Sequence, residues 1–182
     1  MSYQLGWQTF GGGQREADEV TAADHWVIDR TGEQVVLYGE SAGGLSVLLA
    51  GAEGLRPLAI ISDSGLVSMT NLVAHNTRMP EALLGPFGAF YPWFSGGARI
   101  LDVGTELRLH PGYRVPTLII QGTADQTIYW HNGPTLARLT HGTLWLLPGV
   151  GHVGAFQAGP TKYISRVNSF IVAAESKGLS GR

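Results

Sequence analysis

A serine between glycines is the residue of this sequence with the clearest chemistry. The stretch G-E-S-A-G at 39–43 follows the β-branched run 34–38 and precedes the small-residue stretch 42–50. We therefore expect a strand, a sharp turn and a helix, with small residues required because a Cβ at either glycine would collide with a neighbouring element. Such a turn exposes the Ser41 hydroxyl as a nucleophile and turns the Ala42 N–H towards developing negative charge. The alternative is a structural Gly-Ser turn.

A serine nucleophile needs a general base and an acid that orients the base. Asp125 follows an apolar run at 116–120, and His152 follows another at 143–147. Because the carboxyl ends of parallel strands meet at one edge of a sheet, both side chains are expected beside Ser41. The order serine, acid, histidine is the one that this kind of turn predicts.

Each of these residues also has a simpler interpretation. Asp125 could cap a helix, and His152 could be a solvated loop histidine. Asp63 follows the run 58–62 directly and is a rival acid. Glu40, inside the turn, is interpreted as a local polar contact. The other histidines lack the spacing of metal ligands, so we expect no metal site and no cofactor.

Five aromatic residues crowd into the eight positions 87–94, which follow Pro86 and contain Pro92. We expect a compact loop or a short helical cap there instead of a regular helix. Segment 66–114 as a whole is then an aromatic-rich cap or loop insertion, whose aromatic side chains form an acyl-pocket wall or a short lid. Ordinary core beneath a loop and contact with a membrane surface are the alternatives. The five residues are Phe87, Phe90, Tyr91, Trp93 and Phe94.

Length and composition favour a single globular domain. The chain has 182 residues, with 12 basic against 14 acidic side chains and no cysteine. This balance argues against nucleic-acid binding, and the lack of cysteine excludes disulfides and thiolate metal sites. No apolar stretch is long enough to span a membrane, and the start does not resemble a signal peptide, so we expect a cytoplasmic protein unless a signal has been removed. Alternating strand and helix patterns, beginning with a helix at 14–30, predict a doubly wound, mostly parallel α/β sheet with helices on both faces.

Three segments together resemble the α/β-hydrolase superfamily, in its esterase, lipase and serine-aminopeptidase-like branch. Residues 39–44 resemble its nucleophile elbow, 115–125 the strand that carries the acid, and 148–152 the loop that carries the histidine. The resemblance implies one hydrolase domain over 1–182 and a Ser41, His152 and Asp125 triad. It further implies that carboxylic esters are cleaved through an acyl-enzyme.

The N-terminal part departs from that family pattern. Only 40 residues precede Ser41, so 2–9 resembles the last strand before the first helix, and the strand that carries the second oxyanion donor is missing. Three explanations remain open: a natural minimal or truncated hydrolase, a replacement donor from the glycines at 11–13, with Gly11 and Gly12 as candidates, or completion by a second chain. An uncovered edge strand tends to pair with another strand, which favours a homodimer, in which a second copy of the chain completes the fold.

The sequence thus predicts a serine hydrolase acting on small-molecule esters with short acyl chains or aryl groups. One alternative is a non-catalytic binding or scaffold module of the same fold. Another is an acyltransferase or perhydrolase, which uses the same triad with an acceptor other than water.

Overall fold

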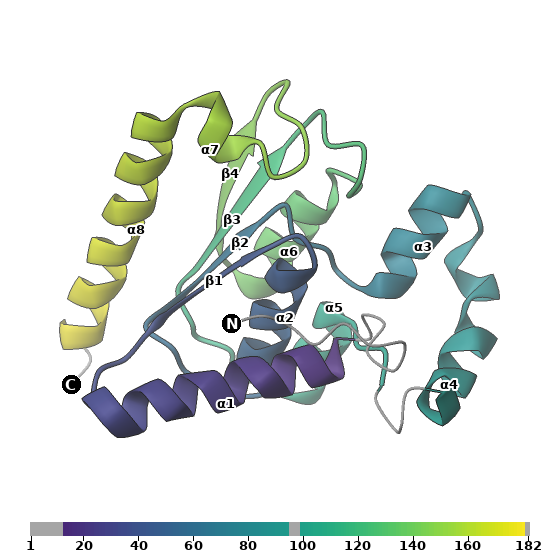
Figure 1. Ribbon diagram of the computed structural model, residues 1–182, viewed down its shortest axis with the longest axis horizontal. Coiled ribbons are helices and arrows are strands. Elements are labelled where there is room, and N and C mark those ends of the chain that lie inside the picture. The colour runs from purple at the N-terminus through teal and green to yellow at the C-terminus, as the bar shows by residue number, and fades with distance from the viewer. Residues whose placement is uncertain (1–12, 95–98, 181–182) are drawn as a thin grey trace.

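A four-stranded parallel sheet forms the centre of the molecule. The computed structural model describes residues 13–94 and 99–180. Strand order in the sheet equals order in the sequence, and every neighbouring pair is parallel (Figure 1). The parallel α/β sheet expected from the apolar runs is therefore confirmed. The strands are β1 Val36–Glu40, β2 Ala59–Asp63, β3 Thr117–Gly122 and β4 Thr143–Leu147.

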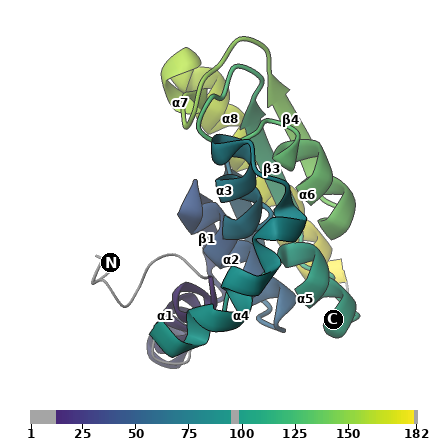
Figure 2. The same cartoon turned by 90° about the vertical axis from the view of Figure 1, so that its right-hand side faces the viewer.

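Helices cover both faces of this sheet. One layer packs around α2, which follows β1 directly, and α8 lies alone along the opposite face (Figures 1 and 2). The short α7 leads from β4 into α8. The first layer contains α1 Gln14–Thr31, α2 Ala42–Ala52, α5 Val103–Leu109 and α6 Asn132–Thr140, and the C-terminal helices are α7 Ala155–Ala158 and α8 Pro160–Ser180.

Alternation along the strands divides the core into two clusters. Ile60 and Ile119 are fully buried with the leucines of α2, whereas their neighbours Ile61 and Ile120 face α8. Because successive side chains of a strand point to opposite faces, strands covered on both sides must be apolar throughout. This explains the continuous apolar runs, and it also fixes the face on which each polar residue at a strand end lies.

The connection between β2 and β3 contains three further helical segments. They are α3 Met69–Thr77, η1 Glu81–Leu83 and α4 Gly85–Phe94, which stand away from the sheet in Figure 1. The expectation that no regular helix forms in the aromatic stretch is wrong, since α4 spans it. Pro86 occupies the first turn, where no intrahelical N–H bond is lost, whereas Pro92 lies inside the helix and removes one backbone hydrogen bond.

No helix within the described ranges combines the length and the apolar character that crossing a membrane requires.

Candidate active site

Ser41 occupies a strained turn between β1 and α2. Its φ of 53° and ψ of −119° lie outside the regions that residues other than glycine normally adopt. Its N–H donates to the Asp63 carbonyl, 2.9 Å away, which ties the turn to the end of β2. Strained backbone of this kind persists only where the surrounding structure enforces it, and it is concentrated at functional sites.

The glycine requirement of this turn differs in part from the expectation. A Cβ on Gly39 would lie 2.2 Å from the Gly43 carbonyl oxygen, as expected for close contact between strand and helix. A Cβ on Gly43, however, would meet nothing within 4 Å, so the expected collision there is wrong. Gly44 is the second required glycine, because its Cβ would lie 2.6 Å from the Ser62 hydroxyl.

The N-terminus of α2 offers hydrogen-bond donors beside Ser41. The Ser41 carbonyl accepts from the N–H groups of Gly44 and Leu45, while the preceding N–H of Ala42 has no acceptor among the described residues. Ala42 is exposed, so this donor is free to meet an oxyanion. Gly11 and Gly12, predicted as replacement donors, lie outside the described residues. Gly13, the next residue, caps α1 and packs on α2.

Asp125 and His152 form a direct pair. His152 Nδ1 lies 2.8 Å from Asp125 Oδ2, and the aspartate side chain is completely buried. Because a carboxylate only accepts, Nδ1 carries the proton and Nε2 remains available as a base. This is the geometry of an acid that orients a catalytic imidazole.

The Asp125 carboxylate accepts further hydrogen bonds from its own loop and from the end of β3. Oδ1 accepts from the N–H groups of Thr127 and Ile128, both at 2.9 Å, and Oδ2 accepts from the Gln121 side-chain amide at 3.1 Å. The helix-cap interpretation of Asp125 is wrong, because the N–H groups that Oδ1 accepts from belong to a turn and α6 begins only at Asn132; Oδ2 faces His152. The backbone bonds hold the carboxylate in one orientation.

Asp63, the rival acid, faces the opposite side of the sheet. Its carboxylate accepts from the hydroxyl of Ser64 at 3.1 Å and from the hydroxyl of Tyr163 on α8 at 3.2 Å. Burial raises the pKa of Asp63 to about 6, against those two hydrogen bonds, which lower it. No hydrogen bond joins Asp63 to His152 in the described part of the chain.

A polar network continues from Asp63 to the elbow. The Tyr163 hydroxyl oxygen also lies 3.1 Å from the Tyr38 hydroxyl oxygen, and the Tyr38 hydroxyl donates to Glu40. Glu40 is thus a local polar contact, as interpreted from the sequence. Loss of solvation on burial is the main reason why the pKa of Tyr163 rises to about 12.

The loop that carries His152 crosses the end of β2 towards Ser41. The Val153 N–H donates to the Ser64 hydroxyl at 3.0 Å, and Ser64 follows β2, the neighbour of the strand β1 that Ser41 follows. Within the described ranges no hydrogen bond joins the Ser41 hydroxyl to His152. The two side chains share one sheet edge, and catalytic hydrogen bonds often shorten only when substrate is bound.

Two of the five predicted pocket aromatics have described side chains. Phe90 is 62% exposed and Trp93 is 87% exposed, so both face solvent in this structure. The side chains of Phe87, Tyr91 and Phe94 lie outside the described part.

The cap approaches the acid loop through an aromatic contact that the sequence did not reveal. His75 of α3 stacks on Tyr129 with ring centroids 4.7 Å apart, and Asn76 donates to the Thr127 carbonyl at 3.3 Å. These contacts connect α3 to the loop that holds Asp125.

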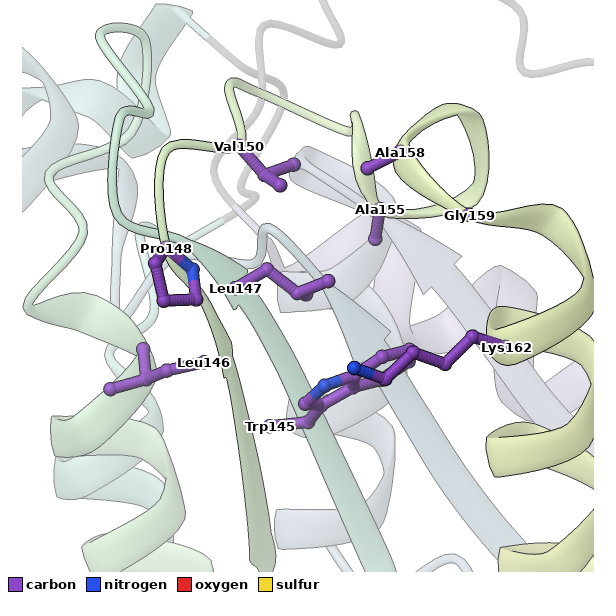
Figure 3. A pocket seen from close by; sticks show the side chains of 9 residues that line it. All are labelled: Trp145, Leu146, Leu147, Pro148, Val150, Ala155, Ala158, Gly159 and Lys162. Atoms are coloured by element: carbon purple, nitrogen blue, oxygen red, sulfur yellow. The ribbon is translucent and has the colours of Figure 1, made fainter.

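An open cavity of about 290 Å³ lies behind the histidine loop, between β4 and the start of α8 (Figure 3). Pro148 and Val150 of the loop line it together with Trp145, Ala155 and Lys162. The cavity is bounded by the edge strand β4, whereas Ser41 follows the strand at the other end of the sheet. Among the described residues no group of three or more histidines and carboxylates could hold a metal ion.

Comparison with solved structures identifies the fold. The chain is similar to the esterase Pf2001 of Pyrococcus furiosus, with a TM-score of 0.67 and 20% identity over 89% of this chain and 63% of that one. It is also similar to E-2-(acetamidomethylene)succinate hydrolase, with a TM-score of 0.60 and 16% identity over 94% and 77%.

A third similar structure comes from work on carboxylesterases of Nitrososphaera gargenis, with a TM-score of 0.57 and 14% identity over 91% of this chain and 75% of that one. No protein-family model and no curated protein sequence matches the chain. The fold is therefore α/β-hydrolase-like, and the chain spans about three-fifths of the Pf2001 esterase.

Sequence reasoning missed three side chains that hold the site. Gln121 is a polar residue at the end of an apolar strand, and this position is the signal that could have found it. Ser64 and Tyr163 carried no such signal, because their partners come from strands and helices distant in the sequence.

Proposed function

We propose that the protein is a serine hydrolase that cleaves carboxylic esters, with Ser41 as nucleophile, His152 as general base and Asp125 as the acid that orients the imidazole. The observation that carries the proposal is the 2.8 Å Asp125–His152 pair at the sheet edge where Ser41 occupies its strained turn. The esterases and hydrolases among the similar structures support the same class of activity.

The reaction follows from these positions. His152 Nε2 takes the Ser41 proton while Oγ attacks the acyl carbon, and the Ala42 N–H donates to the oxyanion. The ester C–O bond breaks when the imidazolium gives its proton to the leaving alcohol. Water, deprotonated by the same imidazole, then attacks the acyl carbon of the acyl-enzyme. The bond from that carbon to Ser41 Oγ breaks, the carboxylic acid leaves, and the imidazolium returns the proton to Ser41.

Short-chain and aryl esters are the proposed substrates. Esters with good leaving groups need little help from leaving-group protonation, so they suit a site with one described oxyanion donor. Loss of one such donor costs about 10²- to 10³-fold in turnover, which predicts modest rates. Glycines 11 and 12 and a second chain remain the candidate sources of another donor.

Hydrolysis of p-nitrophenyl acetate and butyrate tests the proposal. Wild type should hydrolyse both esters, and Ser41→Ala should lose at least about 10³-fold in kcat. Ser165→Ala, which changes an exposed serine of α8, is the matched control and should behave as wild type. Equal rates in wild type and Ser41→Ala would rule out Ser41 as nucleophile.

A non-catalytic binding module is the second candidate, favoured by the absence of a described Ser41–His152 hydrogen bond. A fluorophosphonate reacts only with an activated serine, so it separates the two candidates. Labelling at Ser41 of the folded protein supports the enzyme, whereas an unlabelled protein supports the binding module. Acyl transfer would appear as ester product when an alcohol is added to the assay.

A further inference from the structure

A second pair of residues at the sheet edge that carries Ser41 has left-handed backbone conformation. Five described residues other than glycine have positive φ, and two of them, Arg78 and His141, end helices, where this conformation is common. The other three are Ser41, with a φ of 53°, and Ser64 and Val153, each with a φ of 51°. Ser64 and Val153 therefore need an explanation beyond helix capping.

These two residues are joined by one hydrogen bond. The Val153 N–H donates to Ser64 Oγ over 3.0 Å, and the Ser64 hydroxyl donates in turn to Asp63 at 3.1 Å. Ser64 is completely buried and Asp63 is 2% exposed. Positive φ is especially costly for a β-branched residue such as Val153. The strain persists on both sides of a buried contact, which indicates that the contact constrains the backbone directly after His152.

The surroundings make this anchor important for the histidine loop. On the β4 side the loop borders the open cavity, into which Val150 points (Figure 3). On the β3 side the loop is held at its beginning, where the Gly149 N–H donates to Thr123 Oγ1 at 3.0 Å and the Val150 carbonyl accepts from Ala124. The Ser64 contact therefore fixes the part of the loop that carries the imidazole.

We propose that Ser64 is a positioning residue for the reaction: its hydroxyl, oriented by Asp63, holds the Val153 N–H and so sets the reach of His152 towards Ser41. Asp125 fixes the rotation of the imidazole ring, and Ser64 fixes the backbone from which the ring projects. This inference rests on the proposed ester hydrolysis. It assigns to Asp63 an anchoring role that acts through Ser64.

Ser64→Gly is the most informative variant. Glycine adopts a φ of 51° without strain, so the substitution removes the hydroxyl while relieving the backbone. We expect kcat for p-nitrophenyl butyrate to fall about 10- to 100-fold, the range in which a small misplacement of a catalytic group acts. KM should change less than twofold, because Ser64 does not contact substrate. Ser64→Ala, which removes the same hydroxyl without adding backbone freedom, should give the same split.

Ser62→Ala is the matched control. Ser62 lies in β2, two residues before Ser64, with equal burial, and its hydroxyl has no hydrogen-bond partner among the described residues. It should retain the kcat of wild type. Wild-type kcat in folded Ser64→Gly or Ser64→Ala would overturn the proposal, as would an equal loss in Ser62→Ala. Equal hydrolysis by wild type and Ser41→Ala would instead overturn the proposed function.

Amide hydrogen exchange in wild type tests the anchor without any substitution. The Val153 N–H should exchange at least tenfold more slowly than the Gly151 N–H of the same loop, which has no acceptor among the described residues. Equal exchange at the two positions would show that the anchor does not hold in solution, and would overturn the proposal whatever the variants do.

Discussion

Two aspartates at neighbouring strand ends show how the sheet assigns different roles to the same side chain. Asp63 and Asp125 are both buried, 2% and 7% exposed. Asp125 lies beyond β3 in a loop whose N–H groups surround its carboxylate, and it meets His152. Asp63 is the last residue of β2, on the face covered by α8, and its carboxylate accepts from the hydroxyls of Ser64 and Tyr163. Strand alternation and the conformation of the following loop therefore give different surroundings to Asp125, the proposed orienting acid, and Asp63, the proposed anchor.

Substitution of the two acids tests this comparison with the largest expected effect. Asp125→Asn should lower kcat/KM for p-nitrophenyl butyrate by about 10³- to 10⁴-fold, because the amide no longer selects the productive tautomer of His152. Asp63→Asn keeps an acceptor for Ser64 and should lose no more than about tenfold, the cost of a weakened neutral hydrogen bond. A larger loss in Asp63→Asn than in Asp125→Asn would reverse the assignment.

Gly122→Ala should break the packing between the acid loop and the histidine loop. A Cβ there would lie 2.2 Å from the Val150 carbonyl oxygen, and forcing the two loops apart should cost about 3 kcal/mol of unfolding free energy. Urea denaturation measures this cost. Gly151→Ala, whose Cβ would meet nothing within 4 Å, is the control, and an equal loss in both variants would contradict the packing argument.

The raised pKa of Asp63 predicts that the free energy of unfolding depends on pH. With a folded pKa of about 6 against an ordinary aspartate pKa of 3.8, the folded protein holds this proton more tightly than the unfolded chain. Asp63 therefore lowers stability as the pH rises from about 4 to about 6, by roughly 2 to 3 kcal/mol.

Urea denaturation of wild type and Asp63→Asn at pH 4 and pH 7 measures this contribution. The variant should gain roughly 2 to 3 kcal/mol relative to wild type at the higher pH. Asp29→Asn, which changes an exposed residue of α1, should show no such gain. A constant difference between Asp63→Asn and wild type across this range would contradict the burial argument.

Gln121→Leu tests the smallest contribution to the acid loop. The amide donates one of the hydrogen bonds to Asp125 Oδ2, while the two backbone bonds to Oδ1 remain. We expect kcat to fall about 3- to 10-fold, the effect of removing one supporting hydrogen bond. Gln34→Leu, at an exposed position before β1, should be neutral. A loss as large as that of Asp125→Asn would mean that Gln121 determines the position of the acid.

Much of this arrangement could be predicted from the sequence. Continuous apolar runs predicted four parallel strands, and the G-E-S-A-G stretch predicted the turn at Ser41, because both depend on local patterns. The pairing of Asp125 with His152 followed from the rule that parallel strands end at one edge.

Other features could not be predicted because they depend on tertiary packing. The face on which Asp63 lies requires the strand register, and the Ser64 contact joins residues 89 apart in the sequence. The prolines of α4 suggested a loop, yet Pro86 falls in the first turn, where a helix tolerates proline, and the helix continues through Pro92 at the loss of one backbone hydrogen bond. The requirement at Gly44 instead of Gly43 became visible only with Ser62 in place.

The protonation of the His152 ring tests the central claim most directly. In ¹⁵N-histidine-labelled protein at pH 8, NMR should show the neutral Nδ1–H tautomer in wild type and in Asp63→Asn, because Nδ1 faces Asp125 at 2.8 Å. Asp125→Asn should lose this single tautomer. A ring that stays in the Nδ1–H form without Asp125, or loses it without Asp63, would contradict the assignment of Asp125 as the orienting acid.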